Sequence, residues 1–215
     1  MRVIIISGGH MDDVFALNYL KENKYDCMIA ADAGMDFLYR NHLIPDVVVG
    51  DFDSVKSEGL QYFKGLNNVQ IIQLNPVKDD TDTEFAIREA IRRGATEITL
   101  LGATGTRLDH VLANIYLLGI GLEAGVDIVI VDVHNRIRMV HHSFCIRKEE
   151  QFGDFISVLP IAGNAKGVTL KGMKYLLERK DMDIFSSLGV SNEIVDDVAQ
   201  IQVEQGFLLV VESRE

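Results

Sequence analysis

The first two thirds of the chain alternate short apolar runs with segments of helical period, and few folds accept such an alternation. The helical segments are expected near residues 13–22, 34–42, 55–64, 82–93 and 108–122. The apolar runs are predicted to be buried strands at residues 2–7, 27–31, 46–50, 69–74, 97–101 and 126–131. Because repeated strand–helix–strand units form right-handed crossovers, we predict a mainly parallel, Rossmann-like α/β sheet with flanking helices.

The pattern changes near residue 135. Short strand-like runs such as "DFISVLP", "AQIQVEQ" and "FLLVVES" follow one another, and several are separated by Gly, Asn or Asp turns. This spacing is typical of antiparallel strands. We therefore predict two domains, an α/β domain over residues 1–134 and an all-β sandwich domain over residues 135–215.

Polar clusters follow the predicted strands of the first domain, at the sheet edge where parallel sheets bind ligands. In the cluster "GDFDS", Asp51 and Asp53 are two residues apart, so both carboxylates lie on one side of extended backbone. Two such charges repel unless a cation or a proton lies between them. Oxygen ligands without a Cys or His cluster favour Mg²⁺, with Mn²⁺ as an alternative, over zinc.

The cluster "GATGTRLDH" allows two interpretations. Gly102 and Gly105 could let backbone N–H groups approach an anion at a helix N-terminus, with Arg107 clamping phosphate oxygens. Alternatively, the glycines are ordinary turn residues, Arg107 is solvated and Asp109 is a first-turn helix acid.

Two further clusters are also open to a structural explanation. Thr81 with Glu84 fits a capping box, although capping does not account for three aspartates and Lys78 in "KDDTDTE". Asp32, in "DAGMD", is either the N-cap of the following helix or a ligand-binding residue.

The amino-acid composition limits the classes of molecule that the protein is expected to bind. With 32 acidic and 21 basic residues, the formal net charge of -11 disfavours nucleic acid and anionic membranes, so a phosphate-bearing ligand needs a local cation. No apolar run approaches a membrane span, and the first apolar run is too short for a signal peptide. Cys27 and Cys145 are expected to be buried and reduced, and the protein to be cytoplasmic.

Four stretches together resemble the thiamine pyrophosphokinase family. They are "DAGMDFLYRNHLIPDVVVGDFDS" (32–54), "KDDTDTEFAI" (78–87), "GATGTRLDHVLANI" (102–115), and "GVTLKGMKYLL" (167–177) with "LGVSNE" (188–193). The resemblance implies a nucleotide- and Mg-binding catalytic domain, a β-sandwich domain for thiamine binding and dimerisation, and a homodimer with active sites between subunits. It also implies transfer of the pyrophosphoryl group of ATP to the hydroxyethyl group of thiamine, giving thiamine diphosphate and AMP.

Residue roles follow from the same resemblance. It assigns magnesium binding and catalysis to Asp51, Asp53, Asp82 and Asp109. It assigns ATP and phosphate binding to Asp32, Gly34, Lys78, Thr81, Arg107 and His110, and thiamine binding to Ser191 and Asn192. Because the chain has no tryptophan, an aromatic platform under the thiamine ring would be Phe or Tyr, or would be missing.

Two other functions remain compatible with the residues. A metal-dependent phosphohydrolase would use the same acids to activate water, and would release phosphate without thiamine. A non-catalytic nucleotide-binding module would bind ATP without magnesium dependence and form no product.

Overall fold

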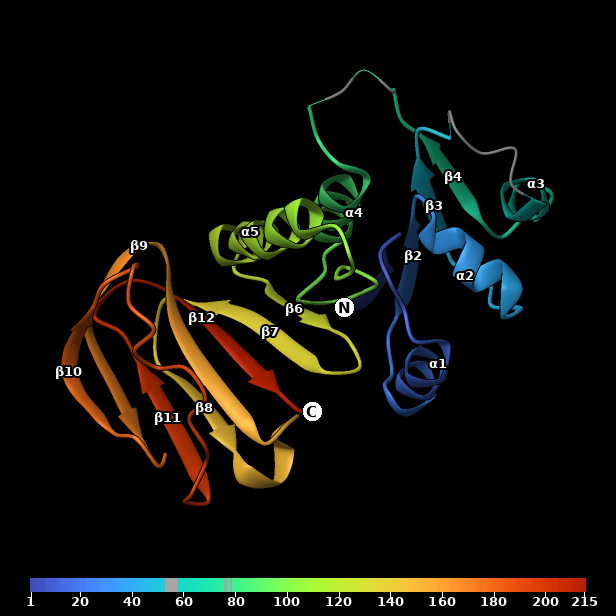
Figure 1. The fold of residues 1–215 in the computed structure, drawn as a ribbon. Coiled ribbons are helices and arrows are strands. Elements are labelled where there is room, and N and C mark those ends of the chain that lie inside the picture. Colours follow the sequence, from blue (N-terminus) through green and yellow to red (C-terminus); the bar gives the residue numbers. More distant parts are fainter. Residues whose placement is uncertain (53–57, 76, 78) are drawn as a thin grey trace. The chain divides into compact units, whose positions relative to one another are not determined.

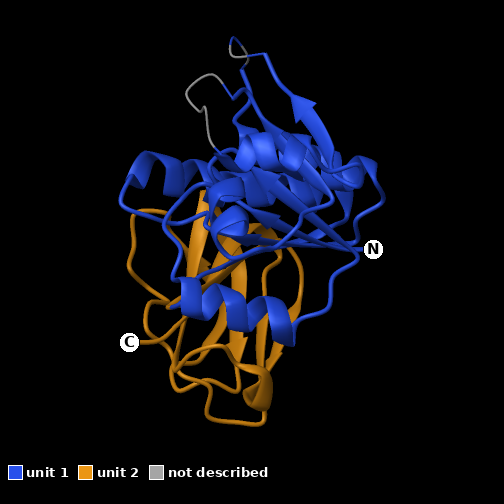
Figure 2. Ribbon diagram, turned by 90° about the vertical axis from the view of Figure 1, so that its right-hand side faces the viewer, with its two compact units in different colours: residues 1–133 blue, residues 134–215 orange. Residues whose placement is uncertain are grey.

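The computed structural model describes residues 1–52, 58–75, 77 and 79–215. The chain forms two compact units, Met1–Val133 and His134–Glu215 (Figure 2). This division lies one residue before the boundary that the sequence pattern predicts.

The strands of unit 1 form one parallel sheet in the order β4-β3-β2-β1-β5-β6. Strand order runs outward from β1 in one direction to β4 and in the other direction to β6, so it reverses between β1 and β5. The strands are β1 (Arg2–Ile6), β2 (Cys27–Ala31), β3 (Val47–Gly50), β4 (Gln70–Gln73), β5 (Glu97–Leu101) and β6 (Asp127–Val131). The predicted parallel α/β class is therefore confirmed.

Helices cover both faces of this sheet, with α4 and α5 on one side and α2 and α3 on the other (Figure 1). All residues of β2 and β3 are buried, which is why their sequences are continuously apolar rather than alternating. The helices are α1 (Asp13–Glu22), α2 (Gly34–Arg40), α3 (Glu58–Lys64), α4 (Asp82–Arg92) and α5 (Leu108–Ala124).

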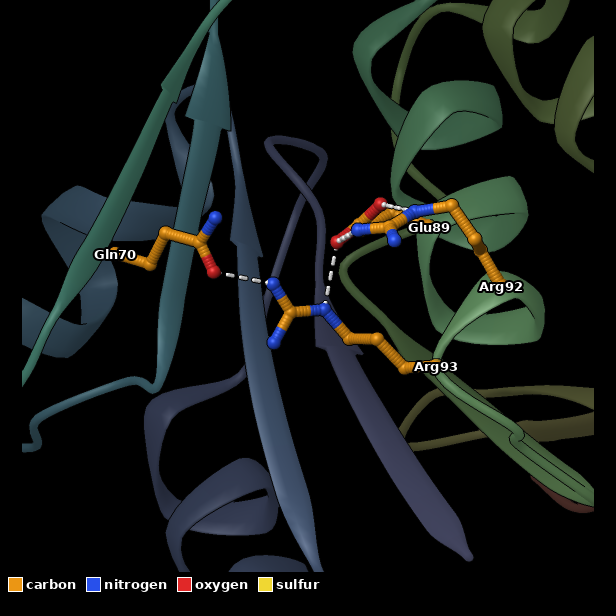
Figure 3. Close-up of polar contacts among 4 residues, drawn as sticks. All are labelled: Gln70, Glu89, Arg92 and Arg93. Atoms are coloured by element: carbon orange, nitrogen blue, oxygen red, sulfur yellow. Dashed lines mark hydrogen bonds and ion pairs between the residues drawn. The ribbon is translucent and has the colours of Figure 1, made fainter.

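A charged network anchors the C-terminal end of α4 to the edge strand β4 (Figure 3). Glu89 is only 5% exposed and accepts hydrogen bonds from Arg92 Nε at 2.8 Å and Arg93 Nε at 2.6 Å. Arg93 Nη2 also donates to Gln70 Oε1 at 2.5 Å. The hydrogen bond from Arg92, followed by that from Arg93, lowers the pKa of Glu89 despite its burial. Fixing this end of α4 also fixes the direction of its opposite end, which faces the carboxyl edge of the sheet.

Unit 2 is a sandwich of two antiparallel sheets that share one long strand, β9. The first half of β9 pairs with β12, which pairs with β7, and its second half pairs with β10 and β11, the latter pairing with β8. Side chains from all six strands form one buried core between the sheets. The elements are β7 (Asn135–Val140), β8 (Phe144–Arg147), a 3₁₀ turn (Lys148–Glu150), β9 (Phe155–Lys171), β10 (Leu177–Met182), β11 (Val198–Gln202) and β12 (Gln205–Ser213).

One detail of this unit differs from the sequence expectations. Cys145 is exposed, because it alternates with buried Ile146 along the edge strand β8; only Cys27 is buried as expected. Both thiols are free. Among the described residues, no helix is long and apolar enough to cross a membrane.

Candidate functional site

A cavity of about 830 Å³ opens at the carboxyl edge of the unit 1 sheet, where the strand order reverses. Loops after β1, β2, β3 and β5 line it together with the first turns of α4 and α5. Open parallel sheets bind ligands at this position, because the loops diverge there and helix N-termini point into the crevice.

Two glycine-containing loops lie back to back on one wall of the cavity. Gly9 N donates to Gly102 O at 2.7 Å, and His10 N donates to Thr104 O at 2.8 Å. A Cβ atom on Gly9 would lie 2.4 Å from both of these carbonyl oxygens, so the two loops approach this closely only because residue 9 has no side chain. The pair of loops therefore forms a rigid wall made largely of backbone.

Five carboxylates line the cavity: Asp32, Asp51, Asp80, Asp82 and Asp109. Asp32 has φ +49° and is not the N-cap of α2, since that position is Ala33; the capping interpretation of Asp32 is wrong. Burial, and secondarily the charges of Asp82 and Asp51, raise the pKa of Asp32, although a hydrogen bond from the Ala33 backbone opposes the shift. The cavity is thus unfavourable to additional negative charge unless a cation enters with it.

These carboxylates fit a magnesium ion that is shared with a substrate. Mg²⁺ is usually held by one or two carboxylates, water and substrate phosphates rather than by a complete protein cage. Within the described ranges, no group of three His, Cys, Asp or Glu side chains is close enough to hold a metal by itself. The donor set therefore suits an ion that arrives with a polyphosphate.

The N-terminus of α4 supplies the opposite wall. Thr81 is its N-cap and accepts a hydrogen bond from Glu84 N at 3.2 Å, while the Glu84 carboxylate lies 2.7 Å from Arg88 instead of completing a capping box. Thr83 Oγ1 donates to Ser7 Oγ at 3.2 Å, which ties this helix to the end of β1.

Arg107 and Asp109 form an ion pair at the start of α5. Arg107 Nη2 lies 2.6 Å from Asp109 Oδ2, and both side chains are about two-thirds exposed, at 69% and 65%. The Arg107 hydrogen bond, followed by smaller backbone and charge effects, lowers the pKa of Asp109. The Arg107 guanidinium and the Asp109 carboxylate are thus hydrogen-bonded to each other.

The cavity brings together most of the residues predicted for unit 1: Asp32, Asp51, Thr81, Asp82, Arg107, Asp109 and His110. Gly34 lies outside its lining; a Cβ there would be 2.0 Å from Ile6 O, so close helix–strand packing explains this glycine. Asp53 and Lys78 lie outside the described residues.

Sequence reasoning assigned no role to several lining residues, among them Ser7, Gly9, His10 and Asn114. The usable signal was the position of "SGGH" directly after the first strand, next in the sheet to the strand that carries "GATG". Asn114 gave no such signal, because its contact with Ala103 depends on how α5 packs against the loop after β5.

In unit 2, the predicted thiamine residues belong to a small hydrogen-bonded loop. Asn192 is 1% exposed, and its side chain accepts from Tyr175 N at 2.9 Å and donates to Tyr175 O at 2.7 Å. Tyr175 itself is 59% exposed. Ser191 is exposed with φ +54° and its N–H donates to Ser157 Oγ at 3.1 Å. The buried Asn192 amide therefore fixes the backbone of Tyr175, whose side chain is exposed.

Comparisons with known proteins cover both units. The family described as "Thiamin pyrophosphokinase, catalytic domain" matches residues 18–130, and "Thiamin pyrophosphokinase, vitamin B1 binding domain" matches residues 141–208. The thiamine pyrophosphokinase of Bacillus subtilis (strain 168) is 30% identical over 211 residues, which are 97% of each chain.

Solved structures agree with the sequence relatives. The crystal structure of thiamine pyrophosphokinase from Bacillus subtilis superposes with a TM-score of 0.87 at 28% identity, covering 100% of both chains. That of a thiamin pyrophosphokinase family protein from Enterococcus faecalis gives a TM-score of 0.84 at 29% identity, again over 100% of both chains.

Proposed function

This chain belongs to the thiamine pyrophosphokinase family, and from this premise we propose that the unit 1 cavity is where it binds ATP together with magnesium. Its activity is the ATP-dependent transfer of a pyrophosphoryl group to thiamine, giving thiamine diphosphate and AMP. The phosphohydrolase and the non-catalytic module lose their support, because both halves of the chain match this one family.

The observation that carries the site proposal is the convergence of five carboxylates, an arginine and two glycine-rich loops on one cavity at the strand-order reversal. Pyrophosphoryl transfer needs the attacking alcohol and the leaving phosphate held in line, and it needs developing negative charge to be neutralised. Mg²⁺, or Mn²⁺, held by Asp51 and Asp82 together with Asp53, would supply part of that neutralisation. Asp32, in the loop after β2, would add to the negative electrostatic potential that attracts the metal ion.

We propose that Arg107 exchanges partners when ATP binds. Its guanidinium fork would leave Asp109 for the phosphate oxygens, and Asp109 would then be available to the magnesium ion. The exchange is easy because the pair is solvent-exposed, where ion pairs contribute little to stability. Thr81 and His110 would contact phosphate from the first turns of α4 and α5.

For thiamine, we propose that unit 2 contributes Ser191 and the Asn192–Tyr175 loop. The Tyr175 ring would serve as the aromatic platform, since the thiazolium ring is a cation and aromatic faces attract cations. Asn192 supports this role because its side chain is hydrogen-bonded to both the backbone N–H and the backbone carbonyl of Tyr175.

We also propose that the enzyme is a homodimer and works in the cytoplasm, where ATP is available. An exposed apolar stripe along α5 supports the dimer: Leu108, Leu112 and Tyr116 are 72%, 55% and 60% exposed at helical spacing.

One experiment tests the function. Purified protein is incubated with ATP, Mg²⁺ and thiamine, and AMP and thiamine diphosphate are separated by chromatography. We expect equimolar formation of both products, none without thiamine and none with excess EDTA. Thiamine-independent release of phosphate, or full activity in EDTA, would contradict the proposal.

A further inference from the structure

Three successive carbonyl groups in the loop after β5 are all held from outside the loop. Gly102 O accepts from Gly9 N at 2.7 Å, and Thr104 O accepts from His10 N at 2.8 Å. Ala103 O, between them, accepts from Asn114 Nδ2 at 2.7 Å. Two of these donors are backbone groups of the neighbouring loop, and the third is the only side chain among them.

Holding the carbonyls orients the opposite side of each peptide. In a trans peptide the C=O of one residue and the N–H of the next point in opposite directions, and the described chain has no cis peptide bond. The N–H groups of Ala103, Thr104 and Gly105 are therefore directed away from Gly9, Asn114 and His10 respectively. None of these three N–H groups has a protein acceptor within the part of the chain that the structure describes.

The middle peptide depends most on its side-chain anchor. Its carbonyl points toward α5 and not toward the loop at Gly9. Among the described residues, the donor that reaches this carbonyl is Asn114, in the second turn of α5. The Asn114 contact is partly buried, and residues 103–106 and 114 all line the cavity. Loss of this hydrogen bond would leave the Ala103–Thr104 peptide free to rotate, so the direction of the Thr104 N–H would no longer be fixed.

We infer that Asn114 is a positioning residue for the reaction: by holding the Ala103 carbonyl, it aims the Thr104 N–H at the transferred pyrophosphoryl part of ATP. The inference rests on the proposed function of the cavity. On this inference, Asn114 affects the binding of the β- and γ-phosphates and not that of the nucleoside. The reason is that the peptide it holds offers a backbone N–H, a group that binds phosphate oxygens.

The test compares Asn114→Ala with Asn41→Ala. Asn41 is a matched control, since its Nδ2 also donates to a backbone carbonyl, Phe37 O at 2.9 Å, in a partly buried position outside the cavity lining. Binding is measured by calorimetry with Mg²⁺ and α,β-methylene ATP, and separately with AMP. In this analogue a methylene group replaces the oxygen between the α- and β-phosphates, so the bond that breaks in the reaction is stable. If Asn114→Ala melts below the assay temperature, Asn114→Leu, which is close in size and has neither the donor nor a charge, replaces it.

For Asn114→Ala we expect the Kd of the ATP analogue to rise about 3- to 10-fold, as for the loss of one hydrogen bond. The Kd of AMP and the KM of thiamine should not change, and Asn41→Ala should bind both nucleotides as the wild type does. An unchanged Kd for the analogue, or an equal weakening of analogue and AMP, would overturn the positioning role. Failure of the wild type to bind the analogue would instead overturn the proposed function of the cavity.

Discussion

At the scale of single residues, the site concentrates negative charge in a partly dehydrated place. Asp32 lies near Asp36, Asp51 and Asp82, and burial together with these charges raises its pKa. A raised carboxyl pKa means that the folded protein disfavours the ionised form, so this group lowers stability at neutral pH. Its left-handed backbone, φ +49°, adds a further cost for a residue other than glycine.

Asp32→Asn should therefore stabilise the ligand-free protein at pH 7. We expect the melting temperature to rise by about 2–4 °C, corresponding to roughly 1 kcal/mol for a chain of this size. Because the folded-state pKa is raised, the gain should shrink as the pH falls toward the ordinary carboxyl value of 3.8. Thermal unfolding at pH 7 and pH 4 measures both effects, with the exposed Asp154→Asn as control. A loss of stability at pH 7 would contradict this account of the charges.

Arg107→Lys tests the proposed phosphate clamp. Lysine keeps the charge but cannot grip two phosphate oxygens with one planar fork, so we expect the KM of ATP to rise about 10-fold. The melting temperature should hardly change, because the Arg107–Asp109 pair is exposed. The control is Arg88→Lys, which alters the ion pair of the exposed Arg88 with the less exposed Glu84 on α4. Unchanged steady-state kinetics with ATP for Arg107→Lys would remove the residue from the phosphate site.

At the scale of elements, the site depends on loops that the sheet brings together. β1 and β5 are neighbours in the sheet although 91 positions separate Ile6 from Glu97, and their loops interlock through Gly9 and Gly102. Because the interlock is backbone to backbone, it leaves no room for a side chain at residue 9.

Gly9→Ala should force these loops apart. A Cβ atom 2.4 Å from two carbonyl oxygens requires backbone movement, which we expect to cost about 3 kcal/mol in the free energy of unfolding. ATP affinity should fall with it. Gly125→Ala is the control: it places alanine at φ +68° after α5 with open space around the Cβ, and should cost about 1 kcal/mol with normal ATP affinity. Urea unfolding and calorimetry separate the two, and equal effects of both variants would contradict the steric argument.

Element prediction succeeded in unit 1 and was incomplete in unit 2. The buried parallel strands are continuous apolar runs, and each predicted run there contains an observed strand. In unit 2, the sequence suggested a short run at "DFISVLP", whereas the strand β9 continues beyond it to Lys171 and passes through Ala162 and Gly163, which have φ +59° and +136°. The polar sequence of β10 gave no strand signal, because most of its side chains are exposed.

For the whole molecule, the net charge of the protein and the charge of its nucleotide substrate are both negative. A net charge of -11 repels a nucleoside triphosphate at long range, and the carboxylates in the cavity add to this repulsion at short range. A divalent ion bound to the nucleotide reverses the local balance, so we expect ATP affinity to depend steeply on Mg²⁺.

The proposed dimer leads to a prediction at this scale. The 24.0 kDa chain should elute as a dimer in size-exclusion chromatography with light scattering. Leu112→Lys, which puts a charge in the middle of the α5 stripe, should shift it toward monomer and lower activity. Val14→Lys, on α1 at 71% exposure, is the matched control and should remain dimeric. A monomeric wild type, or a fully dimeric Leu112→Lys, would contradict the use of this stripe.

Local patterns along the chain are sufficient to specify the fold class and the residue types of the site. Apolar periodicity reports how many faces of an element are covered, and a polar cluster after a strand reports the sheet edge; both are local signals. Motif order then connected the acids with phosphate chemistry. These signals were enough to select Asp32, Asp51, Asp82 and Arg107 as neighbours in one cavity.

Which of these groups already have partners depends on how the chain packs. It paired Arg107 with Asp109, turned the Asn192 amide onto Tyr175, and brought Asn114 back onto Ala103. Such contacts depend on distances and directions between groups that packing sets, and no residue pattern along the chain encodes them. The sequence therefore names the chemistry of the site, whereas packing sets the geometry with which each group meets its partner.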